Sequence, residues 1–244
     1  MTYKEYFLFL GLILLCAIFS GWASRKVHTA FQAYASVQNR SRLTGYDTAV
    51  RLLRAEGITD IAVNRVNGRL TDHYHPTKKV VNLSQATYGD ASVAAVAVAA
   101  HEIGHVVQKK KGYLPYKIRS ILVPIANIGS RLALPLVLIG ILLDIFVSAG
   151  QYADWGFYLA IAGVVAYGMS TLFTLVTLPV ELNASKRAKK MLLAEGILTE
   201  EELPGAEKVL TAAALTYVAA LLTSLVYFLR FALWVLRLVG RNRD

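Results

Sequence analysis

The sequence reads YFLFLGLILLCAIFSGWA over residues 6–23, a run without any charged side chain. A helix of this length is about as long as the hydrocarbon core of a bilayer is thick, roughly 30 Å. The residues before the run carry no net charge, whereas Arg25 and Lys26 follow it, which is the reverse of a secretory signal peptide. We therefore predict an uncleaved transmembrane helix over residues 6–24, with the N-terminus outside.

Three further apolar runs have a similar length, and 55% of all residues are hydrophobic. These runs predict transmembrane helices over residues 121–147, 156–179 and 213–239. The polar segments between them, residues 25–120 and 180–210, are long enough for one small catalytic portion. The pattern predicts a mainly α, multi-pass integral membrane protein with about four transmembrane helices.

The net charge of +10 has two interpretations, nucleic-acid binding and contact with anionic lipid. Of the 26 basic residues, 15 lie in segment 25–120 and 5 in segment 180–210. Basic loops stay on the cytoplasmic side, so we predict that both segments lie on the cytoplasmic face of the cell (inner) membrane. Arg241 and Arg243 are the exception, because four crossings would place them outside. We expect the lipid bilayer as a partner, no nucleic acid and, without a glycine-rich phosphate loop, no nucleotide.

His101-Glu102-Ile103-Gly104-His105 matches the pattern H-E-x-x-H, inside an Ala/Val-rich helix predicted at about residues 92–109. Residues i and i+4 lie on one face of a helix, so His101 and His105 can bind the same Zn²⁺. Glu102 is then placed as general base for a water molecule activated by the metal. The single cysteine, Cys16, excludes a thiolate cluster. The alternative is two histidines held by ordinary hydrogen bonds.

Catalytic zinc usually has three protein ligands, so a third must come from elsewhere. The candidates are His28, His73, His75 or a carboxylate, and we favour Glu181. This residue begins a predicted helix after Pro179, and its neighbours Ala184 and Ser185 leave room for a second helix. The alternative is that Glu181 is only an acidic residue favoured at a helix N-terminus.

Residues 68–84 predict a hairpin or edge strand, because Pro76 marks a turn and a β-rich run follows it. An edge strand can pair with an extended peptide, so we expect Tyr74, Val80 and Asn82 to bind substrate. The oxyanion of the transition state needs a hydrogen-bond donor. Candidates for this donor are His73, Tyr74, Arg119 and Tyr217, although His73 and Tyr74 would also suit simple packing of a hairpin.

Together with residues 101–105, three stretches resemble the bacterial YugP-type neutral zinc metallopeptidases, a family of membrane proteases. They are DHYHP at 72–76, TLPVELNAS at 177–185 and AAALTYVAA at 212–220, and the similarity extends from about residue 45 to 229. The resemblance implies His101 and His105 as ligands, Glu102 as base and Glu181 as third ligand. The family typically has aspartate where His75 stands.

Related membrane zincins carry an aspartate four residues after the third ligand, and this aspartate supports a ligand histidine. Ser185 occupies that position here. A hydrogen-bond partner is still needed to fix the tautomer of the histidine, and Ser185 or Asn183 could supply it.

These observations predict a zinc-dependent endopeptidase with one Zn²⁺ per chain, built as four membrane helices plus a small zincin-like α+β portion. The expected partner is a peptide or protein substrate in or near the membrane. Two alternatives stay open: a protease that cleaves inside the membrane, and a non-enzymatic zinc-binding membrane scaffold or regulator. The oligomeric state is left open.

Overall fold

The computed structural model describes residues 3–146 and 153–241, which form two compact units. The helical unit comprises Met1–Ser20, Ile118–Leu178 and Val218–Asp244, and the mixed unit comprises Gly21–Lys117 and Pro179–Tyr217. Four long helices each contribute residues to both units. These helices are α1 (Tyr3–Ala35), α5 (Leu114–Phe146), α6 (Ala153–Ala194) and α7 (Leu203–Arg241).

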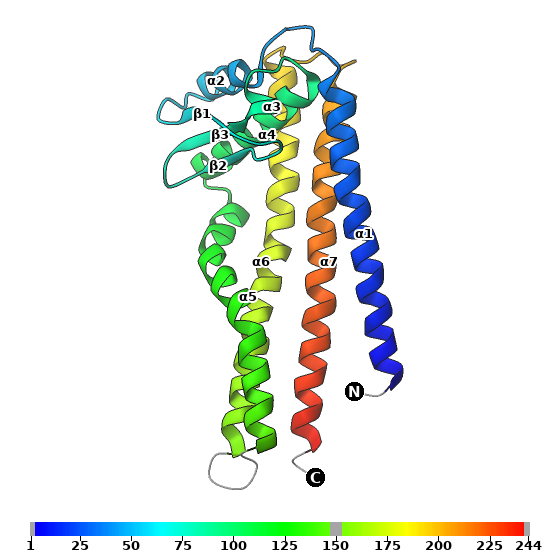
Figure 1. The fold of residues 1–244 in the computed structure, drawn as a ribbon. Coiled ribbons are helices and arrows are strands. Elements are labelled where there is room, and N and C mark those ends of the chain that lie inside the picture. Colours follow the sequence, from blue (N-terminus) through cyan, green and yellow to red (C-terminus); the bar gives the residue numbers. More distant parts are fainter. Residues whose placement is uncertain (1–2, 147–152, 242–244) are drawn as a thin grey trace. The chain divides into compact units, whose positions relative to one another are not determined.

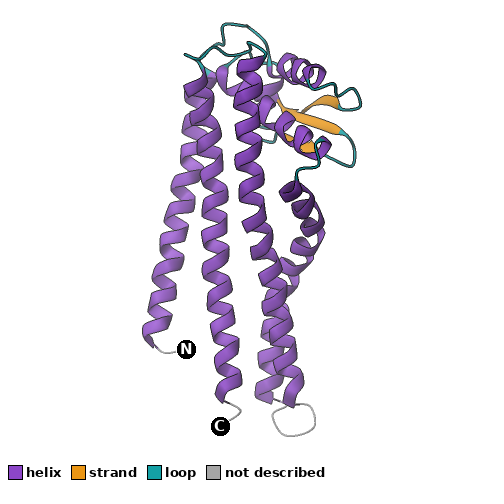
Figure 2. Ribbon diagram, turned by 180° about the vertical axis from the view of Figure 1, so that it is seen from behind, coloured by secondary structure: helices purple, strands orange, loops and turns teal. Residues whose placement is uncertain are grey.

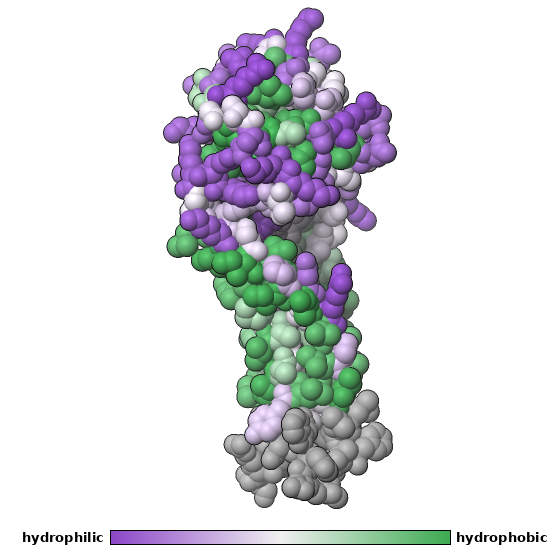
Figure 3. Space-filling model, turned by 90° about the vertical axis from the view of Figure 1, so that its left-hand side faces the viewer, coloured by the Kyte–Doolittle hydropathy of each residue, from purple (hydrophilic) through white to green (hydrophobic). Residues whose placement is uncertain are grey.

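The four long helices carry apolar stretches that are long enough to cross a membrane. The candidate spans lie within Tyr3–Ala35, Leu114–Gly140, Tyr158–Ala194 and Leu203–Arg237. Figure 3 shows hydrophobic side chains over the face of the helical unit that is turned to the viewer. Large apolar side chains such as Ile128 and Leu175 are exposed there, as expected where lipid rather than water is the solvent. The prediction of a mainly α membrane protein is confirmed.

Small and hydroxyl residues hold the helical unit together. A Cβ added to Gly129 of α5 would lie 2.5 Å from the carbonyl oxygen of Ala166 of α6, so these helices touch backbone to backbone. Ser224 of α7 donates a hydrogen bond to Thr171 of α6 over 2.8 Å. Close backbone approach and hydroxyl contacts are typical of helices that pack in lipid, where hydrophobic burial gives no driving force.

Helix α6 continues through Pro179, whereas the sequence suggested that the third span ends there and that a separate helix begins at Glu181. A proline removes one backbone hydrogen bond but does not have to end a helix when other contacts support the turn. The predicted end of the second span at residue 147, and most of the turn after it, lie outside the described residues.

The mixed unit contains a three-stranded sheet of β1 (Ala62–Val66), β2 (His73–His75) and β3 (Val80–Ser84), in the order β1-β3-β2. Strand β3 is parallel to β1 and antiparallel to β2, so β2 and β3 form the predicted hairpin (Figure 2). Strand β3 is therefore the middle strand, and β2 is an outer one.

Helix α4 (Val93–Lys110) forms the core of the mixed unit and packs against both the sheet and helix α2 (Gly45–Ala55). The short helix α3 (Gln85–Tyr88) also lies against it (Figure 1). The Ser92 hydroxyl accepts a hydrogen bond from the Ala95 N–H and so caps the first turn of α4. Almost every residue of α4 up to Gln108 is buried, which is why its sequence consists of small and β-branched residues. This packing fixes the helix that carries the H-E-x-x-H pattern.

Candidate metal centre

Helices α4 and α6 touch at the H-E-x-x-H pattern. A Cβ added to Gly104 would lie 2.7 Å from the carbonyl oxygen of Ala184. Ala184 is fully buried, and Glu181 precedes it by one helical turn. The contact therefore brings the side chains of Glu181 and Ser185 beside those of His101 and His105.

Three ligand atoms converge at this contact. Glu181 Oε2 lies 3.2 Å from His101 Nε2 and 3.4 Å from His105 Nε2. The side chains of His101, His105 and Glu181 are 14%, 9% and 3% exposed, and their ligand atoms all lie within 4.8 Å of one another. Two imidazole nitrogens and one carboxylate oxygen are a donor set that catalytic zinc uses, with a fourth position left for water or substrate.

The hydrogen bonds behind His105 show that a cation fits among these atoms. Gln108 Nε2 donates to the Val180 carbonyl, so the other amide atom, Oε1, is the one that faces His105 Nδ1, at 3.0 Å. An amide oxygen only accepts, so Nδ1 carries the proton and Nε2 of a neutral His105 presents a lone pair to the Glu181 carboxylate. Two acceptors facing each other in a buried place need a proton or a metal ion between them. A zinc ion meets this requirement with all three residues as ligands.

Ser185 lies behind the other histidine, with Oγ 3.1 Å from His101 Nδ1. The sequence suggested Ser185 for this role and Asn183 as an alternative. Asn183 instead contacts Gln108, whose Nε2 lies 3.0 Å from Asn183 Oδ1. The outer nitrogens of both histidines therefore have hydrogen-bond partners, as ligand histidines usually do.

Glu102 is buried beside the ligand cluster, with 7% of its surface exposed. Burial raises the pKa of its carboxyl to about 7, and the negative charges of Glu181 and Asp72 add to this rise, while His101 opposes it. The backbone N–H of Tyr74 in β2 donates a hydrogen bond to the Glu102 carboxylate. The hairpin thus holds a carboxylate whose pKa suits proton transfer near neutral pH.

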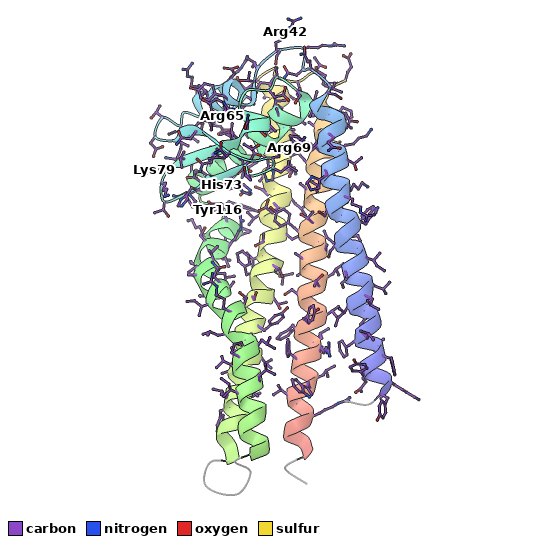
Figure 4. All side chains as sticks on the ribbon, viewed as in Figure 1. Arg42, Arg65, Arg69, His73, Lys79 and Tyr116 are labelled. Carbon is purple, nitrogen blue, oxygen red and sulfur yellow. The ribbon has the colours of Figure 1, made fainter. Side chains whose placement is uncertain are left out.

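The structure places His73 on β2, on the surface of the mixed unit (Figure 4). Its Nδ1 lies 2.8 Å from the Thr71 carbonyl, and its Nε2 lies 3.0 Å from Asn82 Nδ2. A carbonyl only accepts and an amide nitrogen only donates, so Nδ1 of His73 carries the proton. Asn82 thus serves to orient His73.

The residues predicted to bind substrate or to stabilise the oxyanion lie on different elements of the structure. Tyr74 packs against the core, and Val80 is buried in the middle strand, which is paired on both sides. Tyr217 lies on α7 and is partly buried.

Among the alternative third ligands, His28 is exposed on α1 and His75 Nδ1 accepts from the Lys78 N–H. In the described part of the chain, the group of side chains that could hold a metal ion consists of His101, His105 and Glu181.

Two residues of the site escaped sequence reasoning. Gln108 follows His105 by three residues, so it lies on the same face of α4, and a polar residue in that apolar segment was the available signal. Tyr116 is buried, and its ring centroid lies 6.3 Å from that of His105. No local pattern marks Tyr116, because it comes after the turn at Gly112.

Comparison with known proteins identifies the family of this chain. The family described as "Putative neutral zinc metallopeptidase" matches residues 8–236, which include all three ligands. The chain belongs to this family. A curated relative, the "Putative membrane protease YugP" of Bacillus subtilis (strain 168), is 41% identical over 237 residues, or 97% of this chain and 100% of the relative. No solved structure matches the chain. The zinc metallopeptidase family expected from the four motifs is thus confirmed.

Proposed function

We propose that this chain is a zinc-dependent endopeptidase that hydrolyses peptide bonds of membrane or membrane-adjacent proteins. The observation that carries the proposal is the convergence of His101, His105 and Glu181, with the His105 lone pair directed at a carboxylate oxygen. Membership of a zinc metallopeptidase family supports the reaction type. The printed name of the relative, a membrane protease, supports the setting.

The residues of the site divide the chemistry among them. His101, His105 and Glu181 would hold one zinc ion, which when bound acts as a Lewis acid and lowers the pKa of a coordinated water. Glu102 accepts the proton of the attacking water and passes it to the amine that leaves when the peptide bond breaks. Burial raises the pKa of the Glu102 carboxyl above its ordinary value, which favours uptake of this proton.

A hydrogen-bond donor must stabilise the oxyanion that forms on the scissile carbonyl. The candidates from the sequence are His73, Tyr74, Arg119 and Tyr217. We retain His73 and Tyr217, and the burial of Tyr116 beside His105 adds a third. For His73 to serve, its Nε2 must leave Asn82 and carry a proton. A phenol needs no such change, because its hydroxyl is already a donor.

The outer edge of β2 is the proposed substrate-binding strand. Strand β3 covers one edge of β2, and the Tyr74 N–H points to Glu102 rather than to β3. A peptide extended along this outer edge would therefore pass next to the base, with Tyr74 in contact. Val80 and Asn82 would support this strand from β3.

We propose that the protein is a multi-pass protein of the cell membrane, with spans at residues 6–24, 121–147, 156–179 and 213–239. The basic residues of segments 25–120 and 180–210 support a site on the cytoplasmic face. Helix α4 is not among the four candidate spans of the described chain. This observation favours hydrolysis at the membrane surface over cleavage inside the bilayer.

The test is metal analysis and peptide hydrolysis by the full-length protein in detergent, with Glu102→Gln and His101→Ala as variants. We expect about one zinc per chain in the wild type and in Glu102→Gln, much less in His101→Ala, and hydrolysis in the wild type alone. A mixture of internally quenched peptides and casein serves as the substrate probe. If Glu102→Gln cleaved this mixture as fast as the wild type, the proposed mechanism would be wrong. Bound zinc without any hydrolysis by the wild type would support the scaffold alternative instead.

A further inference from the structure

We propose that Gln108 is a positioning residue of the metal centre. Its side-chain amide fixes the tautomer of His105. The same amide also links α4, which carries His101 and His105, to α6, which carries Glu181, by a hydrogen bond. This inference rests on the proposed zinc site, but it concerns how the chain prepares its ligands rather than which reaction follows.

The acceptor half of the amide acts on His105. Gln108 Oε1 lies 3.0 Å from His105 Nδ1, and both side chains are buried. With Nδ1 protonated, Nε2 is left as the free ligand atom on the side of Glu181. The tautomer that can bind the metal is thus selected before the metal arrives.

The donor half of the amide acts on α6. Gln108 Nε2 donates to the Val180 carbonyl over 2.7 Å and to Asn183 Oδ1 over 3.0 Å. Val180 directly precedes Glu181 in α6. The hydrogen bond to its carbonyl therefore fixes the position of the backbone that carries the Glu181 carboxylate. Asn183 Oδ1 also accepts from Arg187 Nε over 2.7 Å, which keeps the amide oxygen of Asn183 turned toward Gln108.

The orientation of Gln108 follows from its partners. The Val180 carbonyl only accepts, so it must face the NH₂ group, and His105 must then face the oxygen. A flipped amide would set two acceptors against each other at 2.7 Å in a place without solvent. Gln108 is fully buried, so such a mismatch would be costly.

The two histidines differ in how strictly their hydrogen-bond partners select the tautomer. His101 Nδ1 faces the Ser185 hydroxyl, which can donate or accept, so that contact does not select a tautomer by itself. His105 faces an amide oxygen that can only accept. Gln108 therefore makes His105 the preorganised ligand of the pair, and its loss should weaken zinc binding even in a correctly folded chain.

The experiment measures zinc affinity of the full-length protein in detergent, by competition with a chelator. Gln108→Met keeps the length of the side chain but removes both halves of the amide, and we expect its zinc affinity to fall roughly 10- to 100-fold. Asn183→Ala, which leaves Gln108 in place, should lose less than Gln108→Met.

The matched control is Thr48→Val, another change of a buried polar residue in the mixed unit, whose hydroxyl has no hydrogen-bond partner. We expect Thr48→Val to bind zinc as the wild type does. The ligand-field absorption of the Co²⁺-substituted protein should change in Gln108→Met and not in Thr48→Val. A loss of packing alone in Gln108→Met would lower its unfolding temperature and leave the Co²⁺ spectrum unchanged.

The outcomes separate this proposal from the proposed function. Wild-type affinity and an unchanged Co²⁺ spectrum in folded Gln108→Met would overturn the role of Gln108, with the zinc site intact. A lower zinc affinity with an unchanged Co²⁺ spectrum in folded Gln108→Met would overturn the part of the argument that concerns the His105 tautomer. A wild type that binds no zinc would overturn the proposed function itself.

Discussion

Gly104 and Ala184 bring two helix backbones into contact, because a Cβ on Gly104 would lie 2.7 Å from the Ala184 carbonyl oxygen. No flexible side chain can give way there, since the obstructing atom belongs to the backbone of α6. The glycine inside the H-E-x-x-H pattern is thus a condition for placing Glu181 beside His101 and His105.

We expect Gly104→Ala to push α4 and α6 apart. Overpacking of this kind should lower the free energy of unfolding by about 1–3 kcal/mol and weaken zinc binding. The measurements are thermal unfolding and zinc content of the purified protein. Gly89→Ala is the matched control, because the same added Cβ meets nothing within 4 Å. Equal zinc content in both variants would contradict the argument.

Glu102→Gln should abolish hydrolysis but stabilise the metal-free protein above neutral pH. The pKa of Glu102 is about 7 in the folded chain against an ordinary value of 4.5. Between these values the folded chain binds more protons than the unfolded chain, so its free energy of unfolding falls as pH rises. Each pKa unit corresponds to about 1.4 kcal/mol. At pH 8, Glu102→Gln should therefore raise the free energy of unfolding by at most about 3 kcal/mol over the wild type.

The measurement for Glu102 is denaturant unfolding of the metal-free wild type and Glu102→Gln, at pH 5 and at pH 8. The two proteins should differ little at pH 5, where Glu102 is protonated in the folded chain. A difference at pH 8 no larger than that at pH 5 would show that burial does not hold the Glu102 pKa near 7.

Glu181→Gln should lower zinc affinity by more than roughly 100-fold, because it removes a ligand rather than the partner of a ligand. Chelator competition measures this loss. Glu207→Gln is the control, since Glu207 forms an exposed ion pair with Lys189 in the mixed unit. Unchanged zinc binding in Glu181→Gln would show that another residue is the third ligand, and His73 and His75 would be the next candidates.

Ser185→Ala should weaken zinc binding by about 10-fold, because His101 Nδ1 loses its partner at 3.1 Å. Ser185→Asp should tighten binding, since a carboxylate is a stronger acceptor for an imidazole N–H than a hydroxyl. Zinc titrations of both variants against the wild type check the two directions. The idea that Ser185 supports His101 fails if both substitutions leave the affinity unchanged.

Much of the fold could be predicted because its signals are local. Apolar runs predict membrane helices, and the alternation of β-rich and turn residues around Pro76 predicts the β2–β3 hairpin. The prediction that failed, a helix end at Pro179, assumed that proline stops a helix. That assumption ignores that a helix can lack one backbone hydrogen bond and still continue, when contacts such as that of Gly104 with Ala184 hold its next turn in place.

The sequence by itself determined that the chain has membrane-spanning helices and that His101, Glu102 and His105 share a helix, since hydrophobic length and i, i+4 spacing are properties of single elements. Only the tertiary structure decided which distant groups complete the site. Glu181 is 80 residues from His101, and Gln108 is 72 residues from Val180. Contacts over such separations depend on packing, here on one glycine that lets two backbones touch, and no spacing rule encodes them.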